Sequence, residues 1–333
     1  MTRTYDACIF GCGPAGSAVA ARLSDLGMLP LVLDRPSNSS AWHGESFAGA
    51  IAEPLRALDL LDAFQSAEHV KSYEERIDWG GGPWLRESLF RAYGSLWHVD
   101  RAQFNTSLRE ALRLRAVPVV RYRKLVDLRY ERERWRIALT PGGELFARFL
   151  VDATGRARVV SRRLGVRPRS YDRLVALTAS IPRNRDASFD HAMVIAARPD
   201  GWWYAAPVPQ GHVLTFLTDA DLAPIALRAF MRTVAANSSF AQSKPGSAWL
   251  AVGDACAAHD PLYGSGTYRA LVDGIRAAEA ITSSLAEGNS AQTHAFRRRC
   301  AEQFQSYLSG LSQHYSYEKR WQSLPFWKRR CAA

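Results

Sequence analysis

Three glycines near the start of the chain have the spacing of a phosphate-binding turn. Gly11, Gly13 and Gly16 form the pattern G-x-G-x-x-G, and Asp34 follows 18 residues after the last of them. In such a turn the first glycine permits a tight bend, the second lets the backbone approach a pyrophosphate, and the third lets a helix pack on a strand. The free N–H groups at the start of a helix also favour an anion. Because an acid at this position can accept hydrogen bonds from ribose hydroxyls, these residues predict a dinucleotide site.

The elements that must position this turn are readable on either side of it. An apolar run over residues 7–10 is short enough for a buried strand, residues 17–23 have helical spacing, and a second apolar run over residues 29–33 ends at Asp34. This order is that of a βαβ unit. The predicted nucleotide contacts come from Gly11, Gly13, Pro14, Ala15, Gly16, Asp34 and Arg35. The turn by itself leaves open whether the nucleotide is FAD or NAD.

Composition bounds the class of protein. With 333 residues, of which 47% are apolar and 23% charged, the chain is expected to form a globular protein of two domains. It contains neither a run of 18 uncharged apolar residues nor a secretory core before the first strand, so we expect a cytoplasmic protein. The five cysteines lack C-x-x-C spacing, so neither a disulfide framework nor a metal site is expected.

The positive charge is unevenly distributed. The formal net charge is +11, and ten arginines lie between positions 101 and 136 against four acids. Such a surface attracts polyanions. Because no nucleic-acid-binding module accompanies it, an anionic cofactor, a carboxylate substrate or an acidic protein partner is expected instead of nucleic acid.

Later segments predict a second sheet inserted into the first domain. We expect one helix from Ile51 to Phe64, strand-like segments over residues 70–78, and a helix after Asp100, which caps it. Residues 174–218 have the extended, proline-broken pattern of an antiparallel sheet. A buried strand at residues 249–252 then returns to the first domain, and helices follow from Thr267. The expected division is residues 1–70, 96–165 and 246–288 for the nucleotide domain, 71–95 and 166–245 for the substrate domain, and 289–333 for a helical C-terminal segment.

Several motifs together resemble one family. They are the glycine turn, Asp152-Ala153-Thr154-Gly155-Arg156, Gly253-Asp254-Ala255, Gly44-Glu45-Ser46, Trp97 to Arg101, Gly201 to Pro207, and Pro261 to Gly266. Their order is similar to that of FAD-dependent monooxygenases with the p-hydroxybenzoate hydroxylase fold, in the tryptophan-halogenase-like branch. The resemblance implies an α/β fold with a Rossmann-type FAD-binding domain of the glutathione-reductase kind, an inserted antiparallel substrate sheet and C-terminal helices.

The resemblance also assigns cofactor contacts. Asp254 would hold the ribityl hydroxyls of FAD and Arg101 would neutralise phosphate, while Ser46 belongs to the Gly-Glu-Ser motif. The turn that aims a helix N-terminus at the flavin would contribute Pro261, Gly264, Ser265 and Gly266.

Two departures from the halogenases affect the expected reaction. Halogenases of this branch carry W-x-W-x-x-P, whereas here the aligned residues are Trp202, Tyr204 and Pro207. They also carry a catalytic glutamate where Tyr263 stands. Lys71, eight residues before Trp79, resembles the halogenase lysine in spacing, but without its glutamate partner we expect a surface residue.

The favoured function is therefore aromatic hydroxylation through a flavin C4a-hydroperoxide, with O2 as cosubstrate and NAD(P)H as electron donor, directly or through a separate reductase. The substrate would be a phenol, an indole or a tryptophan residue, including one presented on a peptide or carrier protein. Candidate catalytic residues are His259, Tyr263, Tyr204 and Glu45, with His98 as a further base; candidate aromatic walls are Trp42, Trp79, Trp202 and Trp203. The alternatives are a flavin-dependent halogenase, an FAD-dependent alkene (prenyl) reductase and a non-catalytic RNA-binding or scaffold protein.

Overall fold

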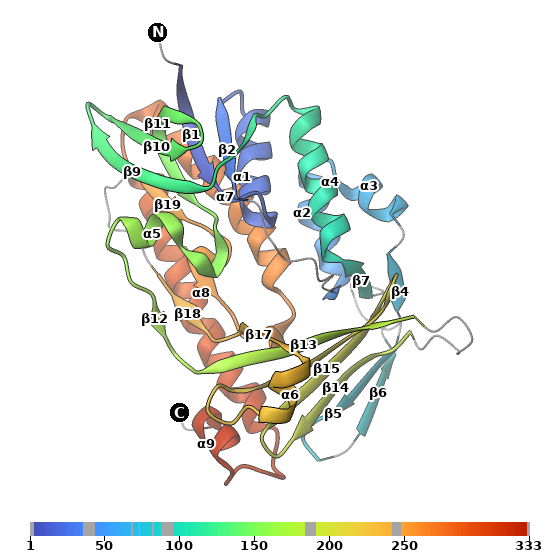
Figure 1. The fold of residues 1–333 in the computed structure, drawn as a ribbon. Coiled ribbons are helices and arrows are strands. Elements are labelled where there is room, and N and C mark those ends of the chain that lie inside the picture. Colours follow the sequence, from blue (N-terminus) through green and yellow to red (C-terminus); the bar gives the residue numbers. More distant parts are fainter. Residues whose placement is uncertain are drawn as a thin grey trace.

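The first sheet is built around the predicted βαβ unit (Figure 1). The computed structural model describes residues 3–35, 44–67, 69–72, 74–81, 83–87, 96–183, 191–241 and 248–331. Strand β1 (Thr4–Phe10) leads into helix α1 (Pro14–Asp25) and strand β2 (Pro30–Asp34). Because Ala7 to Phe10 and Leu31 to Leu33 are buried, both strands form the centre of the first core.

Five more strands complete the parallel part of this sheet and its antiparallel edge. The order is β8-β2-β1-β11-β10-β9, with β19 beside β11. The added strands are β8 (Val119–Arg121), β9 (Lys124–Glu131), β10 (Arg134–Thr140), β11 (Gly143–Asp152) and β19 (Trp249–Ala251). Strands β2 and β11 run parallel to β1, and β19 runs parallel to β11, so the carboxyl ends of these four strands meet at one edge. This edge carries the three segments that the motifs singled out, and ligands of open α/β sheets bind at such an edge.

Small residues let two helices pack closely over this edge. Helix α7 (Gly266–Glu287) lies beside α1 in Figure 1, and a Cβ placed on Gly274 would come 2.7 Å from the Ala15 carbonyl oxygen. Helix α4 (Arg101–Leu114) covers the other side of α1. Its N-cap is Asp100 as predicted, since the carboxylate accepts hydrogen bonds from the backbone N–H groups of Ala102 and Gln103.

The second sheet is mostly antiparallel; β5 and β6 precede β11 in the chain, and its other strands lie between β11 and β19. Its order is β17-β13-β16-β15-β14-β5-β6, in which β14 and β5 are parallel. The strands are β5 (Glu74–Asp78), β6 (Pro83–Glu87), β13 (Leu174–Pro182), β14 (Met193–Arg198), β15 (Gly201–Val208), β16 (Gly211–Asp219) and β17 (Arg232–Ala235). The fold class implied by the resemblance is therefore confirmed.

Two local expectations are wrong. The strand β4 (Val70–Ser72) does not join the second sheet; it pairs with β7 (Leu96–Asp100), which also pairs with β3 (Gly44–Phe47). The helix expected from Ile51 to Phe64 is broken into η1 (Gly49–Ile51), α2 (Ala52–Ala57) and α3 (Leu61–Ser66). The break falls at Asp59, whose φ of 55° lies in the left-handed region of backbone conformations. A right-handed helix cannot continue through a residue in that conformation.

Short elements and the C-terminal helices complete the fold. The short ones are η3 (Gly155–Ala157), α5 (Val159–Arg163), α6 (Ile225–Phe230), η4 (Gly253–Ala255), η5 (Pro261–Tyr263), and β12 (Arg169–Ser170), β18 (Ser239–Phe240) and β20 (Ala257–Ala258), which form a three-stranded sheet. Helix α8 (Ala291–Ser316) runs beside the first sheet down to the second, where α9 (Pro325–Cys331) ends the described chain (Figure 1). No helix among the described residues is long and apolar enough to cross a membrane.

Candidate active site

The carboxyl edge of the first sheet opens into a cavity of about 420 Å³. Gly11 has a φ of +104°, and a Cβ there would lie 2.4 Å from the Ala153 carbonyl oxygen, so this position accepts glycine alone. A Cβ on Gly16 would lie 2.0 Å from the Gly11 carbonyl oxygen. Around Gly13, by contrast, no atom lies within 4 Å of an added Cβ. The first and third glycines therefore close the turn, while the second leaves space for a ligand.

Acidic and basic side chains line the rest of this cavity. Asp34 ends β2 and its Oδ2 accepts a hydrogen bond from Arg109 of α4 at 3.3 Å. Arg35 and Tyr122 lie beside it, and burial raises the pKa of Tyr122 to about 12. This end of the cavity therefore has a carboxylate, Asp34, that can bind ribose hydroxyls, and arginine side chains near it.

Arg101 and Glu45 meet at the other end of the cavity. The Arg101 Nη1 donates to the Glu45 carboxylate and, at 3.0 Å, to Thr267 Oγ1, while the Thr267 hydroxyl donates to Glu45 Oε1 at 2.9 Å. Glu45, predicted as a catalytic residue, is thus held by the predicted phosphate ligand. In this arrangement its carboxylate orients Arg101 and the first turn of α7.

A second cavity of about 1040 Å³ lies between the first domain and the second sheet. Glu45, Asp254 and Gly266 line both cavities, which are therefore adjacent. The turn from Pro261 to Gly266, including Gly264 and Ser265, forms one wall, and α7 begins at Gly266. Asp254 lies 3.5 Å from the Nε of Arg156, measured at Oδ2.

These residues fit FAD. The open side of Gly13 and the start of α1 suit a pyrophosphate, and Asp34 suits a ribose. Asp254 lies where the two cavities meet, and the start of α7 faces the larger one. The cofactor would therefore extend from the small cavity, with its adenosine end at Asp34, into the large one, where its flavin ring supplies redox chemistry.

Strand register determines which side chains form the opposite wall. One row across the second sheet consists of Ile77, Ile195, Tyr204, Thr215 and Thr178, each paired with the next. A second row consists of Trp202, Leu217, Ala176 and Val234. All of these residues line the large cavity. Since alternate residues share a face, the wall is an apolar sheet surface with few hydroxyl groups.

One chain of polar contacts crosses this wall. Ser46 Oγ lies 2.6 Å from both the Tyr204 hydroxyl and His98 Nδ1. His98 is fully buried, its Nε2 has no hydrogen-bond partner among the described residues, and burial lowers its pKa to about 4. Burial raises the pKa of Tyr204. Ser46, predicted as a cofactor ligand, therefore lines the large cavity and holds Tyr204, and neither ring is charged near neutral pH.

The other two predicted catalytic residues differ in setting. His259 lines the large cavity, is 8% exposed and packs on the Tyr307 ring at 4.1 Å between centroids. Burial lowers the pKa of His259 to about 3, so its imidazole is a weak base. Tyr263 also lines the cavity, but it is 38% exposed and packs against Tyr307 and Gly310 of α8.

The aromatic candidates divide between the two faces of the second sheet. Trp79 and Trp202 line the cavity. Trp203 does not, because the next residue along a strand points to the opposite face, where Trp203 packs on Phe216 at 4.8 Å. The expectation for Trp203 is therefore wrong, and Trp42 lies outside the described residues.

Lys71 is an exposed residue of β4, as expected. Its Nζ lies 4.5 Å from the centre of the Trp97 ring, a cation–π contact. No lysine is among the described residues that line the large cavity.

Several lining residues were missed by the sequence analysis. They are Glu75 on β5, Asp260 before the Pro261 turn, and His314 and Tyr317 at the end of α8. Asp260 accepts hydrogen bonds from the Leu262 N–H at 2.9 Å and the Tyr315 hydroxyl at 2.7 Å, and burial raises its pKa to about 6. The Asp260-Pro261 pair is a turn signal that could have identified Asp260. His314 and Tyr317 are far from the other lining residues in the sequence, so no local pattern indicates that they reach the cavity.

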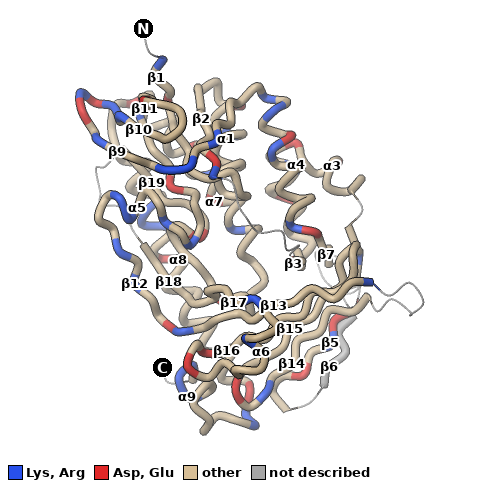
Figure 2. The backbone as a smooth tube through the Cα atoms, viewed as in Figure 1, with Lys and Arg blue, Asp and Glu red and all other residues tan. Residues whose placement is uncertain are grey.

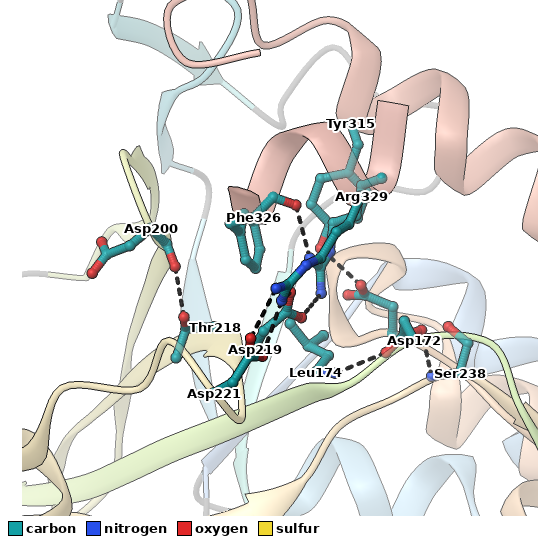
Figure 3. Close-up of polar contacts among 12 residues, drawn as sticks. Asp172, Leu174, Asp200, Thr218, Asp219, Asp221, Ser238, Tyr315, Phe326 and Arg329 are labelled. Carbon is teal, nitrogen blue, oxygen red and sulfur yellow. Dashed lines mark hydrogen bonds and ion pairs between the residues drawn. The ribbon is translucent and has the colours of Figure 1, made fainter. Parts of the chain in front are cut away.

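An ionic cluster fixes the C-terminal helices against this wall. Figure 3 shows Arg329 of α9 facing Asp219 and Asp221 at the end of β16. Arg330 donates to Asp219 Oδ1 at 2.7 Å, and Asp219 is 1% exposed. Tyr315, also in Figure 3, accepts a hydrogen bond from Trp202 Nε1 at 3.1 Å. The C-terminal segment thus holds part of the cavity wall in place.

Comparisons with known proteins agree with the assignment of FAD as the cofactor. The family model described as tryptophan halogenase matches residues 83–333. LodB of Marinomonas mediterranea, a proposed FAD-dependent oxidoreductase, is 28% identical over 364 aligned residues, covering 99% of this chain and 97% of LodB. The solved structure of CmlS, a flavin-dependent halogenase, is similar with a TM-score of 0.84 at 21% identity, over 99% of this chain and 68% of CmlS.

A further similar structure is that of QhpG, a peptidyl tryptophan dihydroxylase essential for tryptophylquinone cofactor biogenesis. Its TM-score is 0.77 at 23% identity, over 99% of this chain and 79% of QhpG. At these identities the two solved structures show a shared fold. The match of the family model over most of the chain shows more: this protein belongs to the tryptophan halogenase family, and it is an FAD-dependent oxidoreductase.

Proposed function

We propose that the protein is an FAD-dependent monooxygenase that hydroxylates an electron-rich aromatic ring, with the indole of a tryptophan residue as the favoured substrate. The observation that carries this proposal is the position of Lys71. A halogenase of the kind described above needs a lysine and a glutamate at a site remote from the flavin. Here Lys71 is outside the cavity on the Trp97 ring. Tyr263 is the residue that the motif resemblance aligns with the glutamate.

The proposed reaction balances with one O2 and two electrons. One oxygen atom enters the ring in place of a hydrogen, the other leaves as water, and NAD(P)H is oxidised, directly or through a separate reductase. Bound FAD supplies the oxygen activation. The chain itself would hold the cofactor with Gly13, Asp34, Arg101 and Asp254, and would exclude water from the ring with the apolar sheet wall.

Within the cavity, Tyr204 is the group best placed to orient the substrate. Its hydroxyl is held by Ser46, which His98 holds in turn. Because the imidazole of His98 is neutral at physiological pH, the hydrogen-bonded series of Tyr204, Ser46 and His98 can present a fixed hydroxyl without adding a charge. Tyr204 would contact one edge of the aromatic ring.

A polypeptide is the proposed carrier of the substrate. QhpG acts on a peptidyl tryptophan, and its similarity supports this form of presentation. The net charge of +11 favours an acidic carrier. Figure 2 shows basic residues on many elements with acidic ones among them, as in α4 and the β9–β10 turn, so the attraction would be spread over the surface. A complex with an acidic polypeptide that weakens with salt supports this, and tight, steeply salt-dependent binding of nucleic acid contradicts it.

The test uses the FAD-loaded protein, reduced photochemically so that no reductase is required. It is exposed to ¹⁸O2 and bromide with N-acetyltryptophanamide and with tryptophan-containing peptides. A product heavier by one ¹⁸O atom, without bromine, supports hydroxylation. Brominated product would favour the halogenase alternative, and reduction of a prenyl alkene without oxygen consumption would favour the reductase.

A further inference from the structure

The second sheet has an open edge beside the large cavity. Strand β17 ends the strand order, so β13 is its one strand partner among the described residues (Figure 1). Its pairing with β13 is regular from Arg232 to Ala235, without a proline or a bulge. The backbone groups of such an edge can pair with another extended chain, and proteins usually protect an edge for this reason. The proposed function gives this edge no role.

The pairing determines which backbone groups of β17 face outward. The Ala236 N–H donates to the Leu174 carbonyl at the start of β13, at 3.0 Å. Residues of an antiparallel pair alternate between those that bond to the partner strand and those whose N–H and carbonyl groups point away from it. Val234, two residues before Ala236, therefore also bonds to β13. The backbone groups of Thr233 and Ala235, both exposed residues, point to the open edge.

The large cavity reaches the surface at this edge. Val234, Ala235 and Ala236 line the cavity, and Ala235 is also exposed. Val234 ends the second row of the cavity wall, where it pairs with Ala176. The other end of that row is the large side chain of Trp202. The small side chains at the β17 end therefore leave room for a ring that enters from outside.

The end of β17 is tied to the cofactor end of the cavity. The Arg156 Nη1 donates to the carbonyl oxygen of Asn237, two residues after β17. The Nε of the same arginine lies 3.5 Å from Asp254 Oδ2, and Asp254 lines both cavities. A ring that enters over β17 would therefore approach the place where the two cavities meet.

We propose that β17 docks the carrier polypeptide: an extended acidic segment pairs with the open edge as an additional antiparallel strand and inserts a tryptophan side chain into the cavity. This inference rests on the proposed function and names how its substrate is presented. Residues that pair across neighbouring strands share a face of the sheet, so the tryptophan would lie opposite Val234 and continue the row of the wall. Its two neighbours would bond to Thr233 and Ala235 and point their side chains to the outer face.

The charge of this part of the chain favours an acidic segment. Residues 222–253 contain no Asp or Glu, and they include Arg228 and Arg232, which are both exposed. Arg232 lies on the same face of the sheet as Val234, because the two are alternate residues of one strand. An acidic residue two positions after the tryptophan would lie opposite Arg232, and opposite charges at paired positions stabilise a strand pair.

Binding of short peptides to the FAD-loaded protein tests the docking without turnover. The probe is acetyl-Glu-Val-Trp-Val-Glu-amide, and its affinity is measured by titration calorimetry. N-methylation of either valine removes an N–H that bonds to β17 and should weaken binding about tenfold. N-methylation of the tryptophan should change the affinity less than about twofold, because that N–H points away from β17 in an antiparallel pair. The proposal is overturned if neither valine is sensitive, or if the tryptophan is equally sensitive.

A second peptide tests the charge of the occupant. Replacement of both glutamates by lysine should weaken binding severalfold at low ionic strength, and added salt should reduce the difference. Equal affinity of the lysine and glutamate peptides would rule out an acidic segment as the occupant.

A matched pair of variants tests the edge itself. Thr233→Pro removes an outward N–H and obstructs a pairing strand, and an edge strand tolerates proline where the N–H faces outward. Thr233→Val is the control, because it keeps the N–H at the same exposed position. The affinity for the glutamate peptide should fall about tenfold in Thr233→Pro and stay within about twofold of native in Thr233→Val. Equal affinities of the two variants would contradict the docking.

Two further measurements keep this test decisive. FAD content and the thermal midpoint show whether each variant is folded; if Thr233→Pro loses FAD, the N-methylated peptides on the native protein carry the test. Light scattering distinguishes a second copy of this chain as the occupant. A native dimer that Thr233→Pro converts to a monomer would overturn the proposal, whereas loss of peptide affinity at an unchanged mass supports it.

The two proposals can fail separately. If peptide binding depends on the edge but no oxygen is transferred in the ¹⁸O2 experiment, the docking stands and the monooxygenase proposal falls. If the peptide is hydroxylated while N-methylation and Thr233→Pro leave its binding unchanged, the reaction stands and β17 is not the docking site.

Discussion

Gly13→Val should separate cofactor binding from folding. An added Cβ at Gly13 meets no atom within 4 Å, and the backbone has a φ of −86°, which any residue can adopt. Valine at this N-cap position costs less than about 1 kcal/mol relative to glycine, or roughly 2 °C in thermal midpoint. The apoprotein should therefore fold almost as the native apoprotein does.

FAD binding by this variant should be strongly weakened. The valine methyl groups would occupy the space that a pyrophosphate needs, and such overpacking costs about 1–3 kcal/mol. Loss of hydrogen bonds to a charged phosphate costs about 1.5–3 kcal/mol more. The total, roughly 3–6 kcal/mol, corresponds to a hundredfold to ten-thousandfold rise in Kd.

The assay is titration of apoprotein with FAD, followed by flavin fluorescence, beside a thermal melt of each apoprotein. Gly13→Ala should give a smaller loss of affinity. Gly16→Ala is the contrast, because its Cβ would lie 2.0 Å from a carbonyl oxygen and should lower the melting midpoint itself. A Gly13→Val protein that binds FAD with native affinity would refute the assignment of this turn to the pyrophosphate.

Three further outcomes are expected. Lys71→Ala should retain substantial turnover, since its side chain lies outside the cavity; a folded, FAD-replete variant without turnover would restore the halogenase alternative. Asp219→Asn should lower the free energy of unfolding by about 3 kcal/mol in urea titrations, because it leaves the buried Arg330 without its carboxylate, whereas Asp221→Asn at the exposed side should cost much less. Because the pKa of His259 is about 3 in the folded protein against 6.5 unfolded, its contribution to stability is lost as pH falls below about 6.5; His259→Phe should therefore reduce the slope of unfolding free energy between pH 6.5 and 5 by up to about 1.4 kcal/mol per unit, and an unchanged slope would contradict this.

Several parts of the site could be predicted because they depend on neighbouring residues. The βαβ unit, its glycine turn and Asp34 follow from a strand, a helix and a backbone approach that lie within about thirty residues. The Asp100 cap follows from the unpaired N–H groups of one helix turn. Parallel strands then bring Asp254 to the same edge, as the motif order implied.

Other features were decided by pairing between distant segments. Whether Trp203 or Trp202 faces the cavity, and whether Glu75 or Glu74 does, depends on which face of the sheet meets the first domain, and a single-residue change in register reverses it. The role of Glu45 depends on its contact with Arg101 of α4, which lies 56 residues further along the chain; the Glu45 carboxylate orients this arginine. Helix α8 contributes to the cavity wall because Asp260 accepts a hydrogen bond from Tyr315, and Asp219 holds the following helix α9 through Arg330; both partners lie more than fifty residues further along the chain. Such contacts depend on how the sheets and helices pack in three dimensions, which local spacing does not specify.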